Sequence, residues 1–186
     1  MTGEEIKVDR ERESPQGQSG AGKYALYQDV CERLVALLGD ETNFIANAAN
    51  TAAFLFHSLE DVNWVGFYLV HGKELVLGPF QGQPACVRIP FGKGVCGAAA
   101  ESGSTVAVPD VDQFPGHITC DPASRSEIVV PLMTWGKLIG VLDIDSPTVN
   151  RFDEEDRDGL ESVVSVLLAS QSSSDLPDLG DEAAEC

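Results

Sequence analysis

The sequence predicts a single α+β domain, in which a central and largely antiparallel six-stranded sheet carries the terminal helices on one face. Apolar residues recur at helical spacing near both ends of the chain and with a period of two in its middle. The period-two segments include pairs separated by the short turns "HGK" and "TWGK", which is typical of antiparallel hairpins. With 43% hydrophobic residues among 186, the chain can bury one core.

Two helices are predicted before the sheet. Tyr24, Leu34 and Leu38 belong to an apolar stripe with helical spacing, and Gly39 follows it as an end signal. A second stripe of the same kind runs over residues 45–56. Both segments are therefore expected to pack an apolar face against the sheet.

Three strands and a short helix come next. Residues 64–70 and 74–80 form the first hairpin, and residues 85–89 read as a third strand. The stretch 90–103, "PFGKGVCGAAAESG", is a glycine-rich loop that runs into a short helix ending at Gly103.

The second half of the domain contains a short strand over 104–110 and a hairpin of 127–133 with 138–145. Pairing residue 132 with residue 138 across the turn places residue 127 near residue 143. The last helix follows Asp153, a predicted N-cap. A loop of about 15 residues separates the short strand from the hairpin, and a loop of that length inside a compact domain usually carries function.

The two ends of the chain lack this patterning. Residues 1–22 are rich in Gly, Ser, Gln and charge and are predicted to be a disordered extension, while residues 172–186 form an acidic, flexible tail. The folded domain is therefore expected over residues 23–171.

The charge of the chain excludes some classes of partner. Thirty acidic and 12 basic residues give a formal net charge of −18, which repels phosphate backbones and anionic lipid, so neither a nucleic-acid nor a membrane partner is expected. No apolar run reaches the length of a bilayer-spanning helix, and the N-terminus lacks the apolar core of a signal peptide. We expect a cytoplasmic location.

The chain has five cysteines, an odd number. Structural disulfides are rare in the reducing compartment that we expect, so each cysteine is considered separately. Cys31 lies on the apolar stripe of the first helix and reads as a buried structural thiol. Cys186, the last residue of the tail, has no expected function. Cys86 lies on a predicted strand with apolar neighbours, where a cysteine is more often part of the core than a chemical group.

Cys96 and Cys120 lie in settings that favour chemistry. Cys96 begins the short helix, whose backbone N–H groups could stabilise a thiolate, although it could equally be a small residue packed beneath that helix. Cys120 lies in the long polar loop, "HITCDPASRSE", where His117 and Arg125 could lower its pKa.

Two other uses of these cysteines are weak. Cys86-x9-Cys96-x23-Cys120 lacks the close ligand pairs of structural zinc sites, so no metal and no cofactor are expected. No cysteine lies in a recognisable hydrolase motif. A thiol-based redox site fits better, because it needs one exposed thiolate and a second cysteine that releases it as a disulfide.

Three carboxylates and two aromatic residues complete the candidate site. Asp143 and Asp145 are two apart on one strand and project from the same sheet face. The antiparallel return brings Glu127 of the partner strand close to them, so each carboxylate should raise the pKa of the others. Asp145 could also simply cap a turn before Ser146. Trp64 and Tyr68 share a strand face, either around an apolar pocket or as core packing.

Several separated motifs together resemble the free methionine-(R)-sulfoxide reductases, which are GAF-domain enzymes. These motifs are "VNWVGFYLV", "LGPFQGQPACVRIPFGKGVCGAAA", "VPDV", "FPGHITCDPASRSEIVVPL" and "GVLDIDSP…RFDEEDRDGL", within residues 24–169. The resemblance implies a GAF fold and a cytosolic enzyme that reduces free L-methionine-(R)-sulfoxide with a thioredoxin-type reductant.

The resemblance also implies roles for individual residues. Cys120 would be the attacking thiolate, Cys86 the resolving partner and Cys96 a second or alternative resolver. Trp64 and Tyr68 would contact the methyl end of the substrate. The amino group and the sulfoxide oxygen would be bound by the carboxylates Glu127, Asp143 and Asp145.

Two rival functions stay open from the sequence. One is a non-catalytic GAF module that senses a small ligand, and the other is an interaction module with incidental thiols. A three-cysteine set and the absence of an attached output domain in this sequence both favour the enzyme. The partners expected are free methionine-(R)-sulfoxide and a thioredoxin-family protein, with a homodimer as an open possibility.

Overall fold

The structure of the protein is a computed structural model that describes residues 21–118 and 121–171. Its elements are, in chain order, α1 (Ala21–Leu38), α2 (Phe44–Ser58), β1 (Trp64–His71), β2 (Glu74–Gln81), β3 (Arg88–Pro90), α3 (Gly94–Ser102), β4 (Val106–Val108), the 3-10 turn η1 (Val111–Gln113), β5 (Ser126–Thr134), β6 (Lys137–Ser146) and α4 (Glu154–Ala169). The predicted order of helices and strands is confirmed. The predicted acidic tail, Cys120 and all but the last two residues of the predicted N-terminal extension lie outside the described residues.

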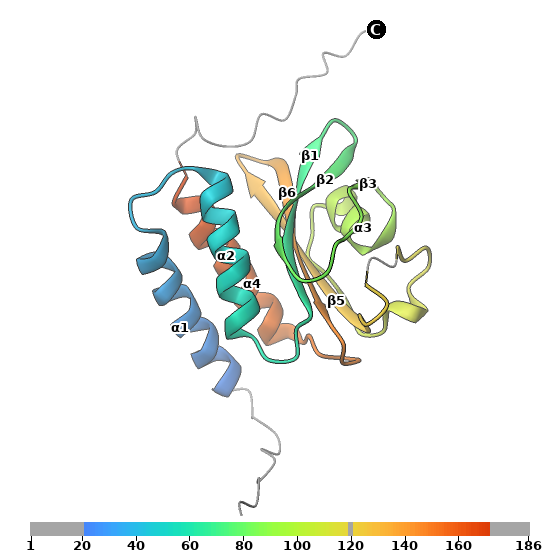
Figure 1. The fold of residues 1–186 in the computed structure, drawn as a ribbon, viewed down its shortest axis with the longest axis horizontal. Helices are drawn as coiled ribbons and strands as arrows, with labels where there is room; N and C mark the ends of the chain where they lie inside the picture. Colours follow the sequence, from blue (N-terminus) through green and yellow to red (C-terminus); the bar gives the residue numbers. More distant parts are fainter. Residues whose placement is uncertain (1–20, 119–120, 172–186) are drawn as a thin grey trace, which may run out of the picture.

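The six strands form one sheet in the order β3-β2-β1-β6-β5-β4, and every neighbouring pair is antiparallel. Helices α1, α2 and α4 form a layer on one face of the sheet, whereas α3 and the loops around it lie on the other (Figure 1). The predicted α+β architecture, with the terminal helices on a single face, is therefore confirmed.

Both faces of the sheet are covered, so the strands alternate between two apolar cores. On β1 and β6, Phe67 and Ile144 face the helical layer and belong to the larger core. Tyr68 and Val141 face α3 and belong to the smaller core. A residue's position along a strand thus decides which layer it meets. The candidate carboxylates all fall on the α3 side.

A buried carboxylate joins the first helix to the last. The side chain of Asp156 accepts hydrogen bonds from Tyr27 (2.9 Å), Lys23 (2.6 Å) and Arg151 (3.1 Å). Asp153 and Asp156 form a reciprocal capping box at the start of α4, which confirms the predicted N-cap. These contacts hold α1 against α4 within the helical layer.

Gly159 supports a prediction about this helix pair. A methyl group at position 159 would overlap the ring of Tyr27. Alanine is ordinarily the better helix former by about 1 kcal/mol, yet we expect Gly159→Ala to lower the free energy of unfolding by about 1–3 kcal/mol, the usual cost of overpacking. Urea denaturation measures it. Ser165→Ala, at an exposed position of the same helix, should change stability little, and a Gly159→Ala protein as stable as the wild type would contradict the packing argument.

Strand β3 is shorter than predicted and excludes Cys86. It spans Arg88–Pro90 and pairs only with the first residues of β2, whereas the prediction placed a strand over 85–89. The preceding segment instead runs over Trp64, whose indole Nε1 donates to the carbonyl oxygen of Gln83 (3.0 Å). Cys86 is therefore a half-buried residue of a loop and not of a strand.

The register of the β5–β6 hairpin also differs from the prediction. Thr134 pairs with Lys137 around a two-residue turn, and a bulge follows between Leu132 and Met133. Glu127 therefore lies opposite Asp145, not near residue 143 as predicted. Because the shift is by two residues, every side chain keeps its face, and the carboxylates still converge.

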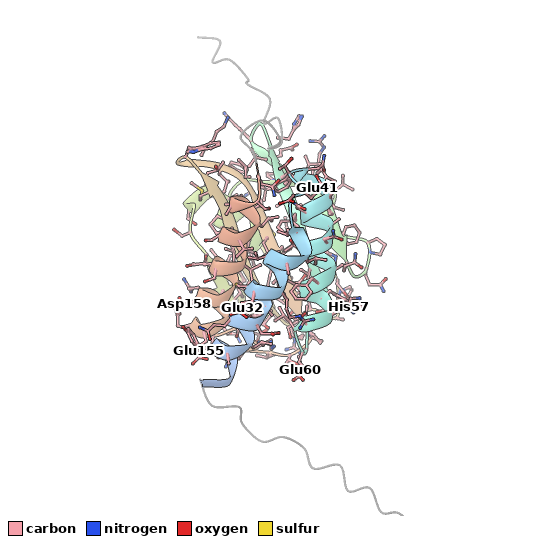
Figure 2. The ribbon with its side chains drawn as sticks, turned by 90° about the vertical axis from the view of Figure 1, so that its left-hand side faces the viewer. Glu32, Glu41, His57, Glu60, Glu155 and Asp158 are labelled. Atoms are coloured by element: carbon pink, nitrogen blue, oxygen red, sulfur yellow. The ribbon has the colours of Figure 1, made fainter. Side chains whose placement is uncertain are left out.

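The outer surface of the helical layer is acidic. Figure 2 shows the exposed side chains of Glu32 and Asp158 on the outer side of α1 and α4. Much of the negative charge in the described part of the chain is thus solvated and lies away from the α3 side of the sheet. In residues 21–118 and 121–171, no helix has both the length and the apolar content that a membrane span requires.

Candidate active site

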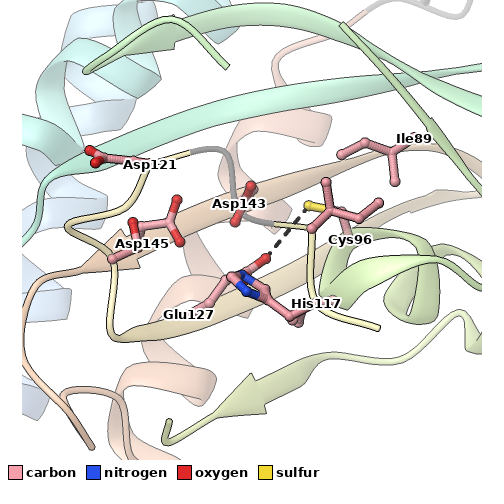
Figure 3. Close-up of a pocket in the computed structure, with 10 residues that line it drawn as sticks. Ile89, Cys96, His117, Asp121, Glu127, Asp143 and Asp145 are labelled. Atoms are coloured by element: carbon pink, nitrogen blue, oxygen red, sulfur yellow. Dashed lines mark hydrogen bonds and ion pairs between the residues drawn. The ribbon is translucent and has the colours of Figure 1, made fainter. Parts of the chain in front are cut away.

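A pocket lies on the α3 side of the sheet, where β5 begins and β6 ends (Figure 3). It is lined by side chains from the sheet, from the start of α3 and from the loop before β5: Ile89, Val95, Cys96, His117, Ile118, Asp121, Ser124, Glu127, Asp143 and Asp145. The long loop that sequence analysis singled out therefore forms one wall of the pocket.

The pocket contains all three predicted carboxylates. Glu127 of β5 lies opposite Asp145 of β6. Asp143 lies two residues earlier on β6, on the same face of the sheet. All three are buried, with 6%, 8% and 6% of their surface exposed, respectively. The predicted convergence is confirmed, whereas the role of each residue stays a prediction.

Burial and mutual repulsion make these carboxyl groups weak acids. Burial raises the pKa of Glu127 well above its ordinary value, and the charge of Asp145 raises it further. Burial likewise raises the pKa of Asp143, with Glu127 as the next cause, and that of Asp145, with Asp143 as the next cause. No Lys or Arg within the described ranges forms an ion pair with any of them. Among the described residues that line the pocket, His117 is the one basic side chain beside these carboxyl groups, and burial lowers its pKa.

Cys96 completes this cluster from the first turn of α3. Its thiol is buried and donates to Oε1 of Glu127 over 3.8 Å. Burial raises the pKa of the Cys96 thiol well above its ordinary value, and the charges of Asp143 and Glu127 raise it further. The predicted stabilisation of a thiolate by the helix N-terminus is therefore wrong, because burial and neighbouring carboxylates outweigh it. The alternative, a small thiol packed beneath the helix, agrees with the structure.

The loop before β5 is attached to the site on both sides of residues 119–120. His117 Nε2 lies 3.6 Å from Oε2 of Glu127, and burial lowers the pKa of His117. Asn63 donates to Oδ2 of Asp121 (2.9 Å) and to Oγ of Ser124 (3.1 Å). Neither Asn63 nor Asp121 belongs to a periodic pattern. The sequence signals that could have identified them as site residues are the position of Asp121 next to Cys120 and that of Asn63 just before β1.

Arg125 does not lie in this pocket. Its guanidinium faces Asp110 at 3.9 Å and Asp112 at 3.7 Å, at the opposite side of the loop. The prediction that Arg125 and His117 lower the pKa of Cys120 concerns a residue outside the described part of the chain.

The remaining predicted residues lie beside the pocket without lining it. Trp64 and Tyr68 are buried in the smaller core and stack on each other, with ring centroids 5.9 Å apart. The space above Gly66 is filled by the Trp64 indole, since a methyl group at 66 would overlap it. Cys86 packs against the same core from its loop.

The fold and this buried cluster place the protein in a known class. Residues 25–170 match the GAF domain family, and the chain belongs to that family. The match lies within the residues 23–171 predicted as the folded domain.

Comparisons with individual proteins are more specific. The chain is 51% identical to a protein of Escherichia coli named free methionine-R-sulfoxide reductase, over 78% of this chain and 88% of that protein. It is 56% identical to Protein YtsP of Bacillus subtilis, over 76% of this chain and 88% of that protein. A structure of free methionine-R-sulfoxide reductase from Neisseria meningitidis in complex with its substrate superposes with a TM-score of 0.77 at 51% identity, covering 82% of this chain and 92% of that one. The resemblance read from the sequence motifs is confirmed.

Proposed function

We propose that this protein reduces free L-methionine-(R)-sulfoxide to methionine. The observation that carries the proposal is the pocket, in which three buried carboxyl groups converge beside the loop before β5. Within residues 21–118 and 121–171, no Lys or Arg pairs with them. The substrate named for the similar E. coli and N. meningitidis proteins agrees with a pocket of this charge.

The pocket charge supports selectivity for a free amino acid. A buried carboxylate is costly unless a cation pairs with it, and the ammonium group of a free amino acid supplies that cation. Methionine sulfoxide within a protein chain has an amide nitrogen in the same position and would leave the carboxylates unpaired. Discrimination then follows from the penalty for unpaired buried groups.

The proposed chemistry uses both sulfur and carboxyl groups. The Cys120 thiolate attacks the sulfoxide sulfur while one protonated carboxyl group of the cluster transfers a proton to the sulfoxide oxygen. The raised pKa values of Glu127, Asp143 and Asp145 favour a neutral carboxylic acid that is able to donate. Methionine leaves with its sulfur reduced, and Cys120 is oxidised to a sulfenic acid.

The enzyme then needs a second thiol to release the oxygen as water. Cys86 is the proposed resolving residue, because its half-buried loop position is more accessible than the buried, carboxylate-flanked Cys96. Its thiol condenses with the sulfenic acid of Cys120 to form a disulfide and water. A thioredoxin-type dithiol reduces that disulfide by exchange. Cys96 is the alternative resolver.

This order of steps predicts a separation between single and multiple turnovers. We expect Cys86→Ser to form about one methionine per prereduced enzyme at the wild-type rate, because the attack by Cys120 precedes resolution. Steady-state turnover with thioredoxin should fall by at least about tenfold, since the disulfide cannot form through Cys86. Rapid-quench assay of methionine measures both quantities. Full recycling by Cys86→Ser, together with its loss in Cys96→Ser, would assign resolution to Cys96.

Trp64 and Tyr68 are proposed as the apolar wall for the substrate methyl group. Trp64 pairs with Asp145 and Gly66 with Asp143 across the β1–β6 ladder, so the aromatic stack lies on the same face as the carboxylates. An amino acid whose ammonium group binds the carboxylates could extend its side chain toward this stack.

A coupled assay tests the function directly. We expect the reduced protein, thioredoxin, thioredoxin reductase and NADPH to consume NADPH on addition of free L-methionine-(R)-sulfoxide, and to be inactive toward the S epimer. Absence of turnover with the R epimer would contradict the proposal. Calorimetric binding of methionine without turnover would instead favour the rival function, a ligand-sensing GAF module.

The remaining parts of the proposal concern the cellular setting. A cytoplasmic location suits a site whose thiols must be returned to the reduced state, because glutathione and thioredoxin keep cytosolic cysteines reduced. A homodimer is the assembly that we expect, and size-exclusion chromatography with light scattering measures it.

A further inference from the structure

The carboxylate cluster also offers a set of metal ligands. Sγ of Cys96 and one carboxylate oxygen each of Glu127 and Asp143 lie within 4.8 Å of one another, and all three residues are buried. They come from α3, β5 and β6, three elements held by the sheet and its smaller core. Because the ligands lie on separate elements, the spacing of cysteines and histidines along the sequence gives no sign of the site.

One oxygen of this set lacks a partner. Oδ1 of Asp143 is buried and has no hydrogen-bond partner among the described residues, although Asp143 is only 6% exposed. A buried acceptor that is left unsatisfied destabilises the folded protein, because it has given up its hydrogen bonds to water. No Lys or Arg of the described residues forms an ion pair with the cluster, and this absence together with the unpaired oxygen indicates that the cluster is built to receive a cation.

We propose that Cys96, Glu127 and Asp143 bind a divalent transition-metal ion, zinc foremost, and that the bound ion excludes the substrate. The second half of this statement depends on the proposed function, because the ion would occupy the position assigned to the substrate ammonium group. The ion is thus a reversible inhibitor of the site and not a cofactor of the reaction.

The geometry of the ligands favours zinc over the hard cations. Tetrahedral zinc with one thiolate and two carboxylate oxygens places sulfur about 3.5 Å from each oxygen. The distance from Cys96 Sγ to Glu127 Oε1 is 3.8 Å, so small side-chain rotations suffice. Magnesium and calcium require six or more oxygen ligands and do not select a sulfur ligand. The fourth zinc position would be taken by water.

The surroundings can support such an ion. His117 Nε2 lies 3.6 Å from Oε2 of Glu127, where it can hold the oxygen that does not bind the metal. Binding displaces to solvent the thiol proton of Cys96 and the proton of whichever carboxyl ligand is neutral, so sulfur enters the site as the thiolate that zinc prefers. No electron is transferred in this step.

Cobalt(II) provides the direct test because its thiolate complexes absorb in the near ultraviolet. We expect the reduced full-length protein to bind one Co²⁺ with a sulfur-to-metal band, and Zn²⁺ to displace it. Cys96→Ser should lose the band, and Asp143→Asn should weaken binding by at least about 100-fold. Cys31→Ser, a thiol on the helical side of the sheet, is the matched control and should bind like the wild type.

The outcomes of the cobalt titration decide the first half of the proposal. Absence of the band from the wild-type protein, or its persistence in Cys96→Ser, would overturn the site. Asp143→Asn keeps the thiol and is nearly isosteric, so its titration decides the question if Cys96→Ser does not fold. None of these measurements requires catalysis, and a negative result leaves the proposed function untouched.

Competition decides the second half. In single turnovers of prereduced enzyme, without a thiol reductant that would chelate the metal, Zn²⁺ should raise the concentration of methionine-(R)-sulfoxide needed for half-maximal rate. The rate at saturating substrate should be unchanged. Zinc that binds at the cobalt site but leaves the substrate dependence unaltered would overturn the exclusion of substrate.

Discussion

Cys120→Ser is expected to abolish the reduction of free methionine-(R)-sulfoxide, with a loss of at least about 10³-fold in both single and multiple turnovers. A serine hydroxyl is a far weaker nucleophile than a thiolate toward sulfur, and it cannot carry the oxygen as a sulfenic acid. Ile118 and Asp121, the neighbours of residues 119–120 in the chain, both line the carboxylate pocket, which supports the assignment of this loop.

The matched control for this prediction is Cys31→Ser. Cys31 is a half-buried residue of α1 that packs against the larger core, on the opposite side of the sheet from the pocket. Its replacement should leave methionine formation at the wild-type level. If Cys120→Ser still forms methionine in the first turnover, Cys120 is not the nucleophile and another thiol must attack.

Asp143→Asn is expected to have two opposite effects, of which the first is on activity. The asparagine amide cannot pair with an ammonium group as a carboxylate does, and it cannot donate an acidic proton. We expect kcat/KM for free methionine-(R)-sulfoxide to fall by about 10²–10⁴-fold, the usual contribution of a positioned acid or base. Asp158→Asn, the same change at an exposed position of α4, should leave activity unaltered.

The second effect of Asp143→Asn is increased stability at neutral pH. Burial and the charge of Glu127 raise the pKa of Asp143 in the folded protein above its unfolded value. The folded state therefore binds more protons than the unfolded state between these two pKa values, and stability falls as pH rises through that interval. At pH values above that interval, removing the carboxylate should raise the free energy of unfolding by on the order of 1 kcal/mol, or Tm by about 2–4 °C.

Thermal unfolding at several pH values measures this effect. The gain in Tm should be present at pH 8 and vanish below about pH 4, where the aspartate is protonated in both states. A variant less stable than the wild type at pH 8 would contradict the argument that like charges strain the cluster. Such a trade between stability and activity is common at catalytic sites.

The sequence predicted the fold because its signals are local. The helical stripe of α1, the alternation along β1 and the capping box at Asp153 each depend on neighbours a few residues away. The convergence of Glu127, Asp143 and Asp145 could also be predicted, since alternation fixes the face of a strand whatever the register. The family resemblance likewise came from contiguous motifs.

Other features of the site depended on contacts between distant segments. Cys86 was predicted on a strand because its neighbours are apolar, but the structure has it in a loop that also carries Gln83, whose carbonyl oxygen accepts a hydrogen bond from the Trp64 indole. For Cys96 the sequence left two interpretations open, a thiolate stabilised by the helix N-terminus and a small thiol packed beneath the helix. The structure places it against carboxylates that lie 31 residues or more away in the chain, and these reverse the expected direction of its pKa shift.

The sequence alone therefore determined the architecture and the faces of the strands, and it supplied the candidate site residues. The tertiary structure decided which of these residues meet, with what register and in what charge state. The physical reason is that hydrophobic periodicity and capping act over a few residues along the chain. A pKa, a metal-ligand set or an unpaired buried oxygen such as Oδ1 of Asp143 depends on burial and on charges that only folding brings within a few ångströms.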